Sequence, residues 1–436
     1  MNSEDGALTK NDIAWNKIFD ELNILQVVLE QGEAIITARQ IKDISGREPR
    51  LMAKFDHSEN LPKVFRDNEL AILPISRGSY VISNFNVYHQ FEIEDTPIER
   101  LSLPSHLQSL NADNIFSETV ALNSALASGM LKDFLDEDEL LSTVSGRMKS
   151  GDLEFSVYNT RTDALQRVTV NSAQIEIDAA YEGIESLAIF EAKNDLSPDF
   201  LVRQLYYPFL TWSSRITKPV RSVFLVYSNG IYRLYEYGFE CPNNYNSIKL
   251  LKHKHYSIED TGISMADIQG IFENIQLVNE PTDIPFPQAD DFERVINLCE
   301  LLNQHQQLTK SEVTENYAFE PRQTDYYVNA ARYLGLVEKS RGDTEVAYKL
   351  SPYGLQVLKM PYKQRQLELC RDILQHKAFY LTFQQSQQIG AVPHKQQLME
   401  NLNASISDEM SETTLGRRSS TIRGWIEWIF KLINEE

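Results

Sequence analysis

Alternating apolar and polar residues between positions 152 and 237 constrain most strongly what this chain can fold into. A period of two is typical of half-buried β-strands. The segments predicted to be strands lie at residues 153–158, 173–181, 186–193, 220–227 and 231–237. A helix is predicted at residues 197–212, because Ser197 can cap its start and Pro198 fits its first position. Strands with an inserted helix indicate an α/β or α+β unit.

The chain has 436 residues, which is too long for one compact core, so several domains are expected. Residues 1–110 are predicted to form an N-terminal α+β domain that opens with a helix at 13–29. Residues 111–285 contain the alternating strands, preceded by a helix at 117–135 that Ser117 can cap. Three prolines at residues 278–288 predict a linker after this second domain.

The last third of the chain is predicted to be mainly helical. Residues 286–360 show three short helical patterns and then a hairpin that turns at Arg341-Gly-Asp, and this order resembles a winged-helix domain. Residues 361–436 are expected to form a C-terminal helical domain. Its last helix has a packing stripe of Ile422, Trp425, Ile426 and Ile429.

The net charge of -20 argues against a protein that coats nucleic acid non-specifically. Most of the net negative charge lies at residues 111–140 and 257–300, so the charge does not exclude DNA binding by other parts of the chain. The chain has three cysteines and no CxxC motif, so neither a disulfide framework nor a structural zinc site is expected. This cysteine usage predicts that the protein resides in a reducing cytoplasm. No signal peptide and no membrane span are predicted.

Three polar residues on two successive predicted strands stand out as a candidate catalytic group. Glu191 and Lys193 share one face of their strand, and Asp178 lies on the strand before it. If the two strands pair as a hairpin, the three side chains converge at one edge. Two carboxylates can ligate Mg²⁺, and an ammonium can orient water or stabilise the oxyanion of a phosphodiester under attack.

The same residues also have a purely structural interpretation, in which they are exposed strand charges or a cross-strand ion pair. The position of Glu191 favours the functional interpretation, in which these residues form a catalytic group. It follows the apolar run Leu187-Ala-Ile-Phe, so its carboxylate is expected to be desolvated and to need a partner.

This pattern resembles the PD-(D/E)xK nuclease superfamily, in its restriction-endonuclease branch. The resemblance covers residues 115–237 and implies a mixed β-sheet flanked by helices, with an Asp on one strand, Glu-x-Lys on the next, and a helix packed beside the site. It assigns a role near the metal water to Gln204 of that helix. The sequence departs from the pattern at Ile177, where the family has proline, and at Pro208, where it often has tyrosine. Glu118 or Glu176 is a further candidate ligand, or a structural charge.

The resemblance implies a Mg²⁺-dependent, sequence-specific endonuclease for double-stranded DNA, of the type II restriction kind, with Mn²⁺ able to replace Mg²⁺. Asp178 and Glu191 are then the metal ligands, and Lys193 and Gln204 complete the catalytic set. A homodimer, at least on DNA, is expected because two strands are cut. No organic cofactor and no membrane partner are expected. The alternatives are a non-catalytic DNA-binding regulator on a nuclease-like scaffold, and a nicking or junction-resolving nuclease.

Several cations and amides are candidates for DNA contact. Residues 145–151, with two glycines and two cations, suit either a loop near a DNA phosphate or a plain solvated turn. The third helix of the winged-helix pattern carries residue types that can bind base edges. The last helix adds arginines together with the small polar residues Ser419, Ser420 and Thr421. The N-terminal domain is mildly basic at residues 39–77, where His57 lies among the cations. The candidate contacts are Arg47, Arg50, Arg147, Lys149, Arg322, Gln323, Asn329, Arg417 and Arg418.

Overall fold

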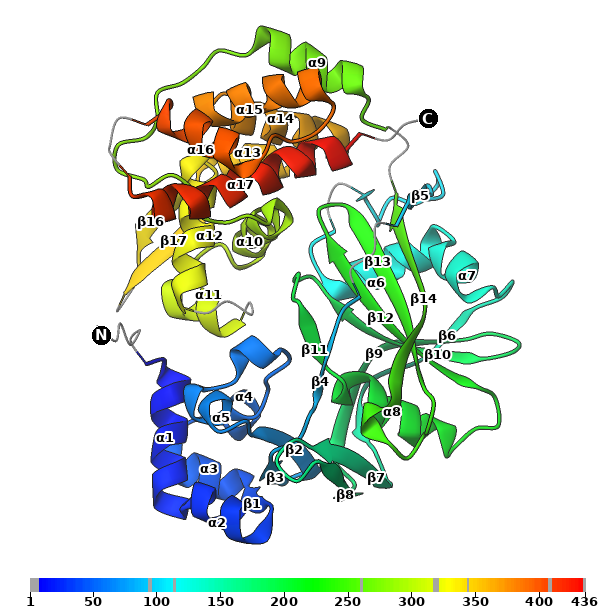
Figure 1. Cartoon of the computed structure of the whole chain (residues 1–436). Coiled ribbons are helices and arrows are strands. Elements are labelled where there is room, and N and C mark those ends of the chain that lie inside the picture. The colour runs from blue at the N-terminus through cyan, green and yellow to red at the C-terminus, as the bar shows by residue number, and fades with distance from the viewer. Residues whose placement is uncertain are drawn as a thin grey trace.

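The computed structural model describes residues 8–92, 96–112, 115–258, 262–316, 321–342, 345–406 and 410–433. It is a mixed α/β chain, as predicted. Figure 1 shows three regions: the N-terminal helices and small strands at the lower left, a large twisted sheet on the right, and the C-terminal helices above. Within the described ranges, every helix is too short or too polar to span a lipid bilayer.

The N-terminal region packs short helices against a small sheet. Trp15, Ile18 and Phe65 form the centre of its core. The predicted helix at 13–29 is two helices, because Asn23 adopts a left-handed conformation with φ of 51° between them. The elements are α1 (Lys10–Leu22), α2 (Ile24–Gln31), β1 (Ala34–Thr37), α3 (Ala38–Ser45), α4 (Pro49–Met52), α5 (Lys63–Asp67), β2 (Ala71–Ser76) and β3 (Ser79–Ser83).

The small sheet joins the N-terminal region to the middle of the chain. Its strand order is β1-β3-β2-β8-β7, where β7 (Asp152–Asn159) and β8 (Ala164–Asn171) come from the predicted second domain. A further short pair links β4 (Tyr88–Gln90) with β11 (Asp199–Leu201). The first two regions are therefore tied together by backbone pairing.

A seven-stranded mixed sheet forms the centre of the molecule. Its order is β5-β14-β13-β12-β10-β9-β6, with β10 parallel to β12 and antiparallel to β9. Asn229 and Gly230 both have positive φ in the two-residue turn between β12 and β13, as a tight hairpin turn requires. The strands are β5 (Ile98–Arg100), β6 (Leu141–Lys149), β9 (Gln174–Glu182), β10 (Leu187–Lys193), β12 (Val220–Ser228), β13 (Ile231–Phe239) and β14 (Ile248–Ser257).

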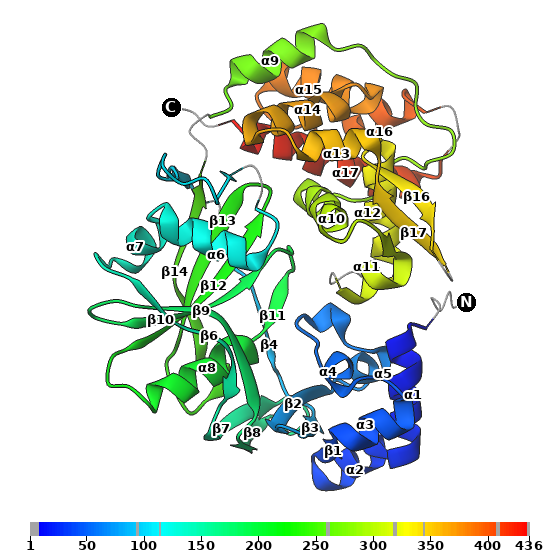
Figure 2. The same ribbon diagram turned by 180° about the vertical axis from the view of Figure 1, so that it is seen from behind.

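Helices cover both faces of this sheet. Helices α6 (Glu118–Ala127) and α7 (Met130–Leu135) bury apolar side chains against Phe190 and Ala192 of β10. Helix α8 (Arg203–Ser213) packs on the opposite face (Figure 2). Ser117 caps α6 as predicted, with its hydroxyl accepting from the Val120 N–H, but the predicted helix at 117–135 breaks at Gly129.

The predicted start of the helix at 197–212 is wrong. Residues Asp199–Leu201 form β11 and pair with β4, so the helix begins only at Arg203. Ser197 donates its hydroxyl to Asp195 and caps nothing. The Ser-Pro pair is a local signal, and the pairing with β4, more than 100 residues earlier in the chain, overrides it. The predicted loop at 145–151 is also wrong, since residues up to Lys149 extend β6 along β9.

The C-terminal helices share one hydrophobic core that extends from Ile263 to Leu432. Three helices followed by a hairpin appear in the predicted order, and Tyr333, Leu334 and Leu336 are buried. The hairpin turn at 341–343 lies partly outside the described residues. The elements are α9 (Met265–Asn274), α10 (Phe292–His305), β15 (Leu308–Thr309), α11 (Lys310–Asn316), α12 (Pro321–Tyr333), β16 (Val337–Arg341), β17 (Val346–Leu350) and α13 (Pro352–Leu358).

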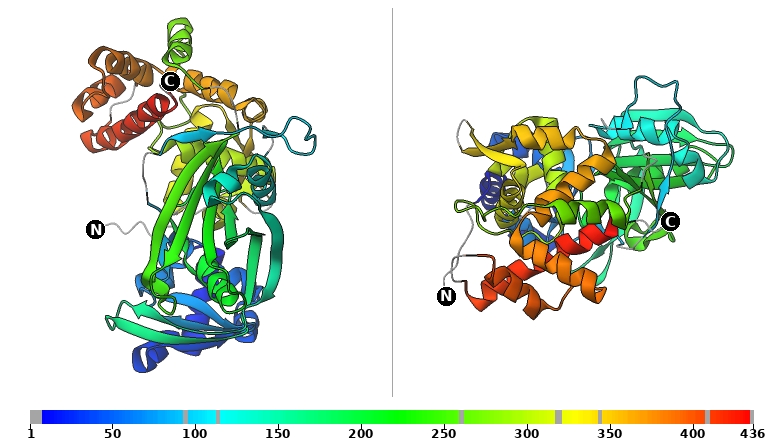
Figure 3. Two further views of the ribbon diagram at one scale, coloured as in Figure 1. Left: turned by 90° about the vertical axis from the view of Figure 1, so that its right-hand side faces the viewer. Right: turned by 90° about the horizontal axis from the view of Figure 1, so that it is seen from above.

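The remaining helices complete this core and stack over one end of the large sheet (Figure 3). They are α14 (Tyr362–Leu374), α15 (Lys377–Ile389), α16 (Lys395–Asn403) and α17 (Glu412–Lys431). The predicted linker lacks helices and strands, yet Phe286 within it is buried in the same core. The predicted stripe on the last helix is confirmed, because Ile422, Trp425 and their two partners are fully buried.

Candidate active site

A pocket of about 380 Å³ lies between the N-terminal region and the face of the large sheet that carries α8. Asp178, Glu191, Lys193 and Gln204 all line it, so the structure brings the four predicted catalytic residues together. The N-terminal region supplies the facing wall, including Asp56 and Tyr80. The pocket is therefore formed by segments far apart in the sequence.

The register of β9 and β10 places the two acids opposite each other. Phe190 pairs with Ala179, so the next step of the ladder would pair Glu191 with Asp178. At that step the ladder stops, and the Asp178 side chain accepts a hydrogen bond of 2.8 Å from the Ala192 N–H. The carboxylate replaces a backbone acceptor there, which fixes Asp178 against the strand that carries Glu191.

Glu191 is the centre of the polar contacts in the pocket. Its Oε1 accepts a hydrogen bond of 2.8 Å from Lys193 Nζ and one of 2.6 Å from Gln204 Nε2. Glu191 and Lys193 share a strand face as predicted, because Phe190 and Ala192 pack on the α6–α7 side. Gln204 reaches Glu191 from the second residue of α8, although Pro208 interrupts the family pattern on that helix.

Burial controls the charges of the acids. It raises the pKa of Glu191 to about 7 and also raises the pKa of Asp178 and of Glu118 at the start of α6. Burial opposes the charge of Lys193, but Glu191, Asp56 and Glu118 together raise its pKa well above the usual value. Asp178, Glu191 and Glu118 are therefore three desolvated acids beside the single ammonium of Lys193, and a cation bound among them would favour their ionised forms.

The donor set fits a Mg²⁺ ion held mostly by water and substrate. Asp178 Oδ1 and Glu191 Oε2 make no hydrogen bond with any residue that the structure describes, so each acid keeps one oxygen for a ligand. Among those same residues, no three His, Cys, Asp or Glu side chains gather closely enough to hold a metal between them. Mg²⁺ usually keeps several waters and binds one or two carboxylates together with substrate phosphates. Asp178 and Glu191 are therefore sufficient as its protein ligands.

Asp56 is a residue of the pocket that sequence reasoning missed. Its carboxylate lies 3.7 Å from Lys193 Nζ and 3.3 Å from Lys54 Nζ. Burial opposes its charge, but Lys193, Lys54 and His57 hold the pKa of Asp56 below its usual value. No motif marks it, because it lies in an irregular segment 135 positions before Glu191.

His57 anchors this segment to the residues that follow β10. Its grouping with the N-terminal cations implied a surface position, which is wrong. It is buried between the Asp195 carboxylate, 2.9 Å from Nε2, and the Asp199 carbonyl, 2.6 Å from Nδ1. Both partners accept, so both ring nitrogens carry protons. Burial opposes this charge, but Asp195 raises the pKa of His57.

Glu176 lies at the rim of the pocket and binds two of the predicted DNA-contacting arginines. Arg50 donates to its Oε2 at 2.8 Å and Arg147 to its Oε1 at 3.0 Å. These ion pairs give Glu176 a structural role, whereas Glu118 is a desolvated acid close to Glu191 and Lys193. Arg77 and Arg203 line the pocket together with Arg50, so three arginines lie around the acids.

The other predicted DNA contacts are spread over the surface. Lys149 is exposed on β6 and Arg47 is half-exposed after α3. On α12, Arg322 is exposed and donates to the Tyr326 hydroxyl, Gln323 is half-exposed, and Asn329 accepts from Arg332. Arg417 is exposed on α17.

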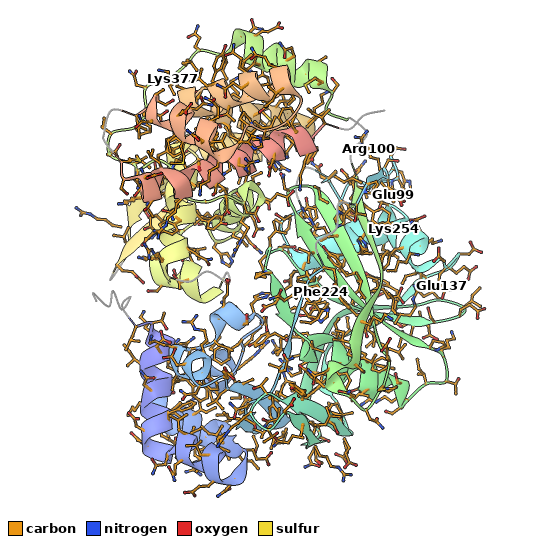
Figure 4. All side chains as sticks on the ribbon, in the orientation of Figure 1. Glu99, Arg100, Glu137, Phe224, Lys254 and Lys377 are labelled. Carbon is orange, nitrogen blue, oxygen red and sulfur yellow. The ribbon has the colours of Figure 1, made fainter. Side chains whose placement is uncertain are left out.

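The expectation that the last helix presents its small polar residues for DNA contact needs correction. Arg418 is only partly exposed and contacts Met410 Sδ, while Ser419 and Thr421 are buried. In the Lys252-His-Lys-His segment, Lys252 binds Asp136, and Lys254 lies beside Glu99 at the edge of the sheet (Figure 4). Burial lowers the pKa of His255 to about 4.

Three family models match parts of the chain, and each is described only as a domain of unknown function. They are DUF6996 at residues 12–82, DUF6997 at residues 83–257 and DUF7226 at residues 294–434. No curated protein matches the chain, and no solved structure matches it. The pocket falls across the first two matched segments, since Asp56 belongs to one and Asp178 to the other.

Proposed function

We propose that this protein is a Mg²⁺-dependent endonuclease for double-stranded DNA, of the type II restriction kind, acting in the cytoplasm. One observation carries the proposal: Asp178, Glu191, Lys193 and Gln204 meet in one pocket, on two paired strands and the helix that follows. The nuclease resemblance implies this arrangement of an Asp strand, a Glu-x-Lys strand and an adjacent helix.

Asp178 and Glu191 would hold the ion, because each keeps one carboxylate oxygen free of other partners. Bound Mg²⁺ supplies positive charge that acidifies water and offsets the charge of the scissile phosphate. Lys193 stays protonated beside its acids and can stabilise the developing oxyanion. Gln204 fixes the Glu191 carboxylate from α8.

The surroundings of the pocket support a phosphate-bearing substrate. Arg50, Arg77 and Arg203 line a pocket whose base is acidic, and Arg147 binds Glu176 at its rim, in a chain with a net charge of -20. Guanidinium groups bind phosphate oxygens in pairs and place a backbone without reading its sequence. Base reading is assigned to the winged-helix-like segment, where α12 presents Arg322, Gln323 and Asn329.

The test is digestion of phage DNA by the purified protein with Mg²⁺, with Mn²⁺ or with EDTA. We expect discrete fragments with either metal and none with EDTA. Asp178→Ala and Lys193→Ala should each reduce cleavage on the order of a thousandfold, while binding to the same DNA in EDTA persists. Asp163→Ala, at an exposed turn between β7 and β8, is the matched control and should cut normally.

Full cleavage by either pocket variant would remove the catalytic assignment. A shift of DNA without cutting in every metal condition would favour the second candidate, a DNA-binding regulator on a nuclease-like scaffold. Nicks without double-strand breaks would favour a nicking or junction-resolving enzyme.

A further inference from the structure

A second cavity, of about 130 Å³, lies between the large sheet and the C-terminal helices. Asn194 and Tyr227 border it from the sheet, Asn303 and Gln304 from α10, and Arg365 from α14. It shares no lining residue with the candidate active site. Its volume is sufficient for several waters or for one small anion.

Arg365 is the unusual member of this wall. Arg365 is 8% exposed, its buried Nε has no hydrogen-bond partner, and it forms no ion pair with any described residue. The Tyr362 ring lies beside it, with its centroid 6.0 Å from Cζ. A buried cation that is not paired with an acid is costly, so this position favours an anion.

The other polar groups at the cavity are compatible with an anion. Asn194 has a buried side-chain amide whose Oδ1 lacks a partner, and rotation of this amide by 180° would turn its NH2 group toward an anion. Lys359 is exposed at the cavity and adds a second positive charge. Glu300 is the one acid in the lining, and its two oxygens already accept from the Ser228 hydroxyl at 2.7 Å and the Asn229 N–H at 2.9 Å.

We propose that this cavity binds a phosphate-class oxyanion. The Arg365 guanidinium would donate paired hydrogen bonds to two of its oxygens, and Lys359 and the Asn194 amide would complete the site. The phosphate can come from a free anion or from the backbone of bound DNA. Asn194 directly follows Lys193, so the anion would lie beside the end of the catalytic strand.

The test uses the full chain and two probes. The first is inorganic phosphate, compared with chloride at equal ionic strength, with the thermal unfolding midpoint as the readout. We expect phosphate to raise the midpoint of the wild type by several degrees more than chloride does. Arg365→Met should lose this rise and should also unfold at a higher temperature without phosphate, because it removes an unpaired buried charge.

Lys359→Gln changes only an exposed lysine at the cavity, and it should weaken phosphate binding several-fold without altering the fold. Lys10→Gln, an exposed lysine on α1, is the matched control and should respond like the wild type. The second probe is a short DNA duplex in EDTA. Weaker duplex binding by both cavity variants identifies backbone phosphate as the ligand, and unchanged duplex binding with lost phosphate response identifies a free anion.

The proposal is overturned if Arg365→Met responds to phosphate as the wild type does. It is equally overturned if phosphate acts no more strongly than chloride on the wild type and neither variant changes duplex affinity. The phosphate measurement does not involve DNA cleavage, so it stands or falls independently of the proposed nuclease activity.

Discussion

At the scale of single residues, Lys193 is held from two directions, by Glu191 on its own strand and by Asp56 from the N-terminal region. Asp56→Asn keeps the shape of the side chain and removes one of these counter-charges. We expect cleavage to fall about tenfold, because Lys193 is then positioned by Glu191 alone. DNA affinity measured in EDTA should not change.

A pH profile separates this positioning role from simple loss of structure. Without the Asp56 charge the pKa of Lys193 falls, so the alkaline limit of activity should move to lower pH. Asp67→Asn, an exposed acid that pairs with Lys63 on α5, is the control with an unchanged profile. A variant of Asp56 with wild-type rate and wild-type profile would show that the contact has no role in cleavage.

Asp372 predicts a pH dependence of stability that is independent of the candidate active site. Burial raises the pKa of this α14 acid to about 7, from 3.8, despite a hydrogen bond from the Tyr353 hydroxyl. Since the folded pKa is the higher one, ionisation of Asp372 destabilises the fold. This loss of stability is absent below about pH 4, grows as pH rises from about 4 to about 7, and is constant above that. At about 1.4 kcal/mol per pKa unit it reaches at most about 4 kcal/mol.

Asp372→Asn cannot ionise, so its urea unfolding midpoint should change less than that of the wild type between pH 6 and pH 8. The same series on Asp43→Asn, an exposed acid on α3, should follow the wild type. Parallel curves for the wild type and Asp372→Asn would contradict the assignment of this acid.

At the scale of secondary-structure elements, the sequence predicted what local periodicity determines. The strands that carry Asp178 and Glu191 were placed within a residue or two, and alternation correctly put Glu191 and Lys193 on one face. Long-range pairing could not be read from the sequence. Residues Asp199–Leu201 look like the first turn of a helix but pair with β4, and Asp56 enters the pocket from a segment without any periodic pattern.

The turn between β12 and β13 predicts a large effect of one methyl group. Gly230 has a φ of 77°, and a Cβ there would lie 2.7 Å from the Tyr362 ring on α14. Gly230→Ala should therefore strain the turn and separate the sheet from the C-terminal helices, lowering the free energy of unfolding by about 2–3 kcal/mol.

Gly46 provides the matched control for this turn. Its φ is 71°, but nothing lies within 4 Å of a Cβ placed there, so Gly46→Ala should show only the backbone cost of about 1 kcal/mol. Urea unfolding of both variants measures the difference. Equal losses would show that the contact between Gly230 and Tyr362 contributes nothing.

At the scale of the whole molecule, the described chain contains one pocket with Asp178, Glu191 and Lys193, while a double-strand cut needs two reactions on opposite strands. A homodimer on DNA provides two such pockets, one for each strand. Asp178→Ala keeps the DNA-contacting surfaces, so mixed dimers with the wild type should bind normally and contain a single active pocket.

Adding a severalfold excess of Asp178→Ala to a fixed amount of wild type should therefore convert double-strand breaks in a supercoiled plasmid into nicks. The nicked form should accumulate because each mixed dimer cuts one strand and then dissociates slowly. Gel electrophoresis of the plasmid forms over time measures this, with an equal excess of bovine serum albumin as the control for added protein. Unchanged linear product at every ratio would show that one chain cuts both strands in turn.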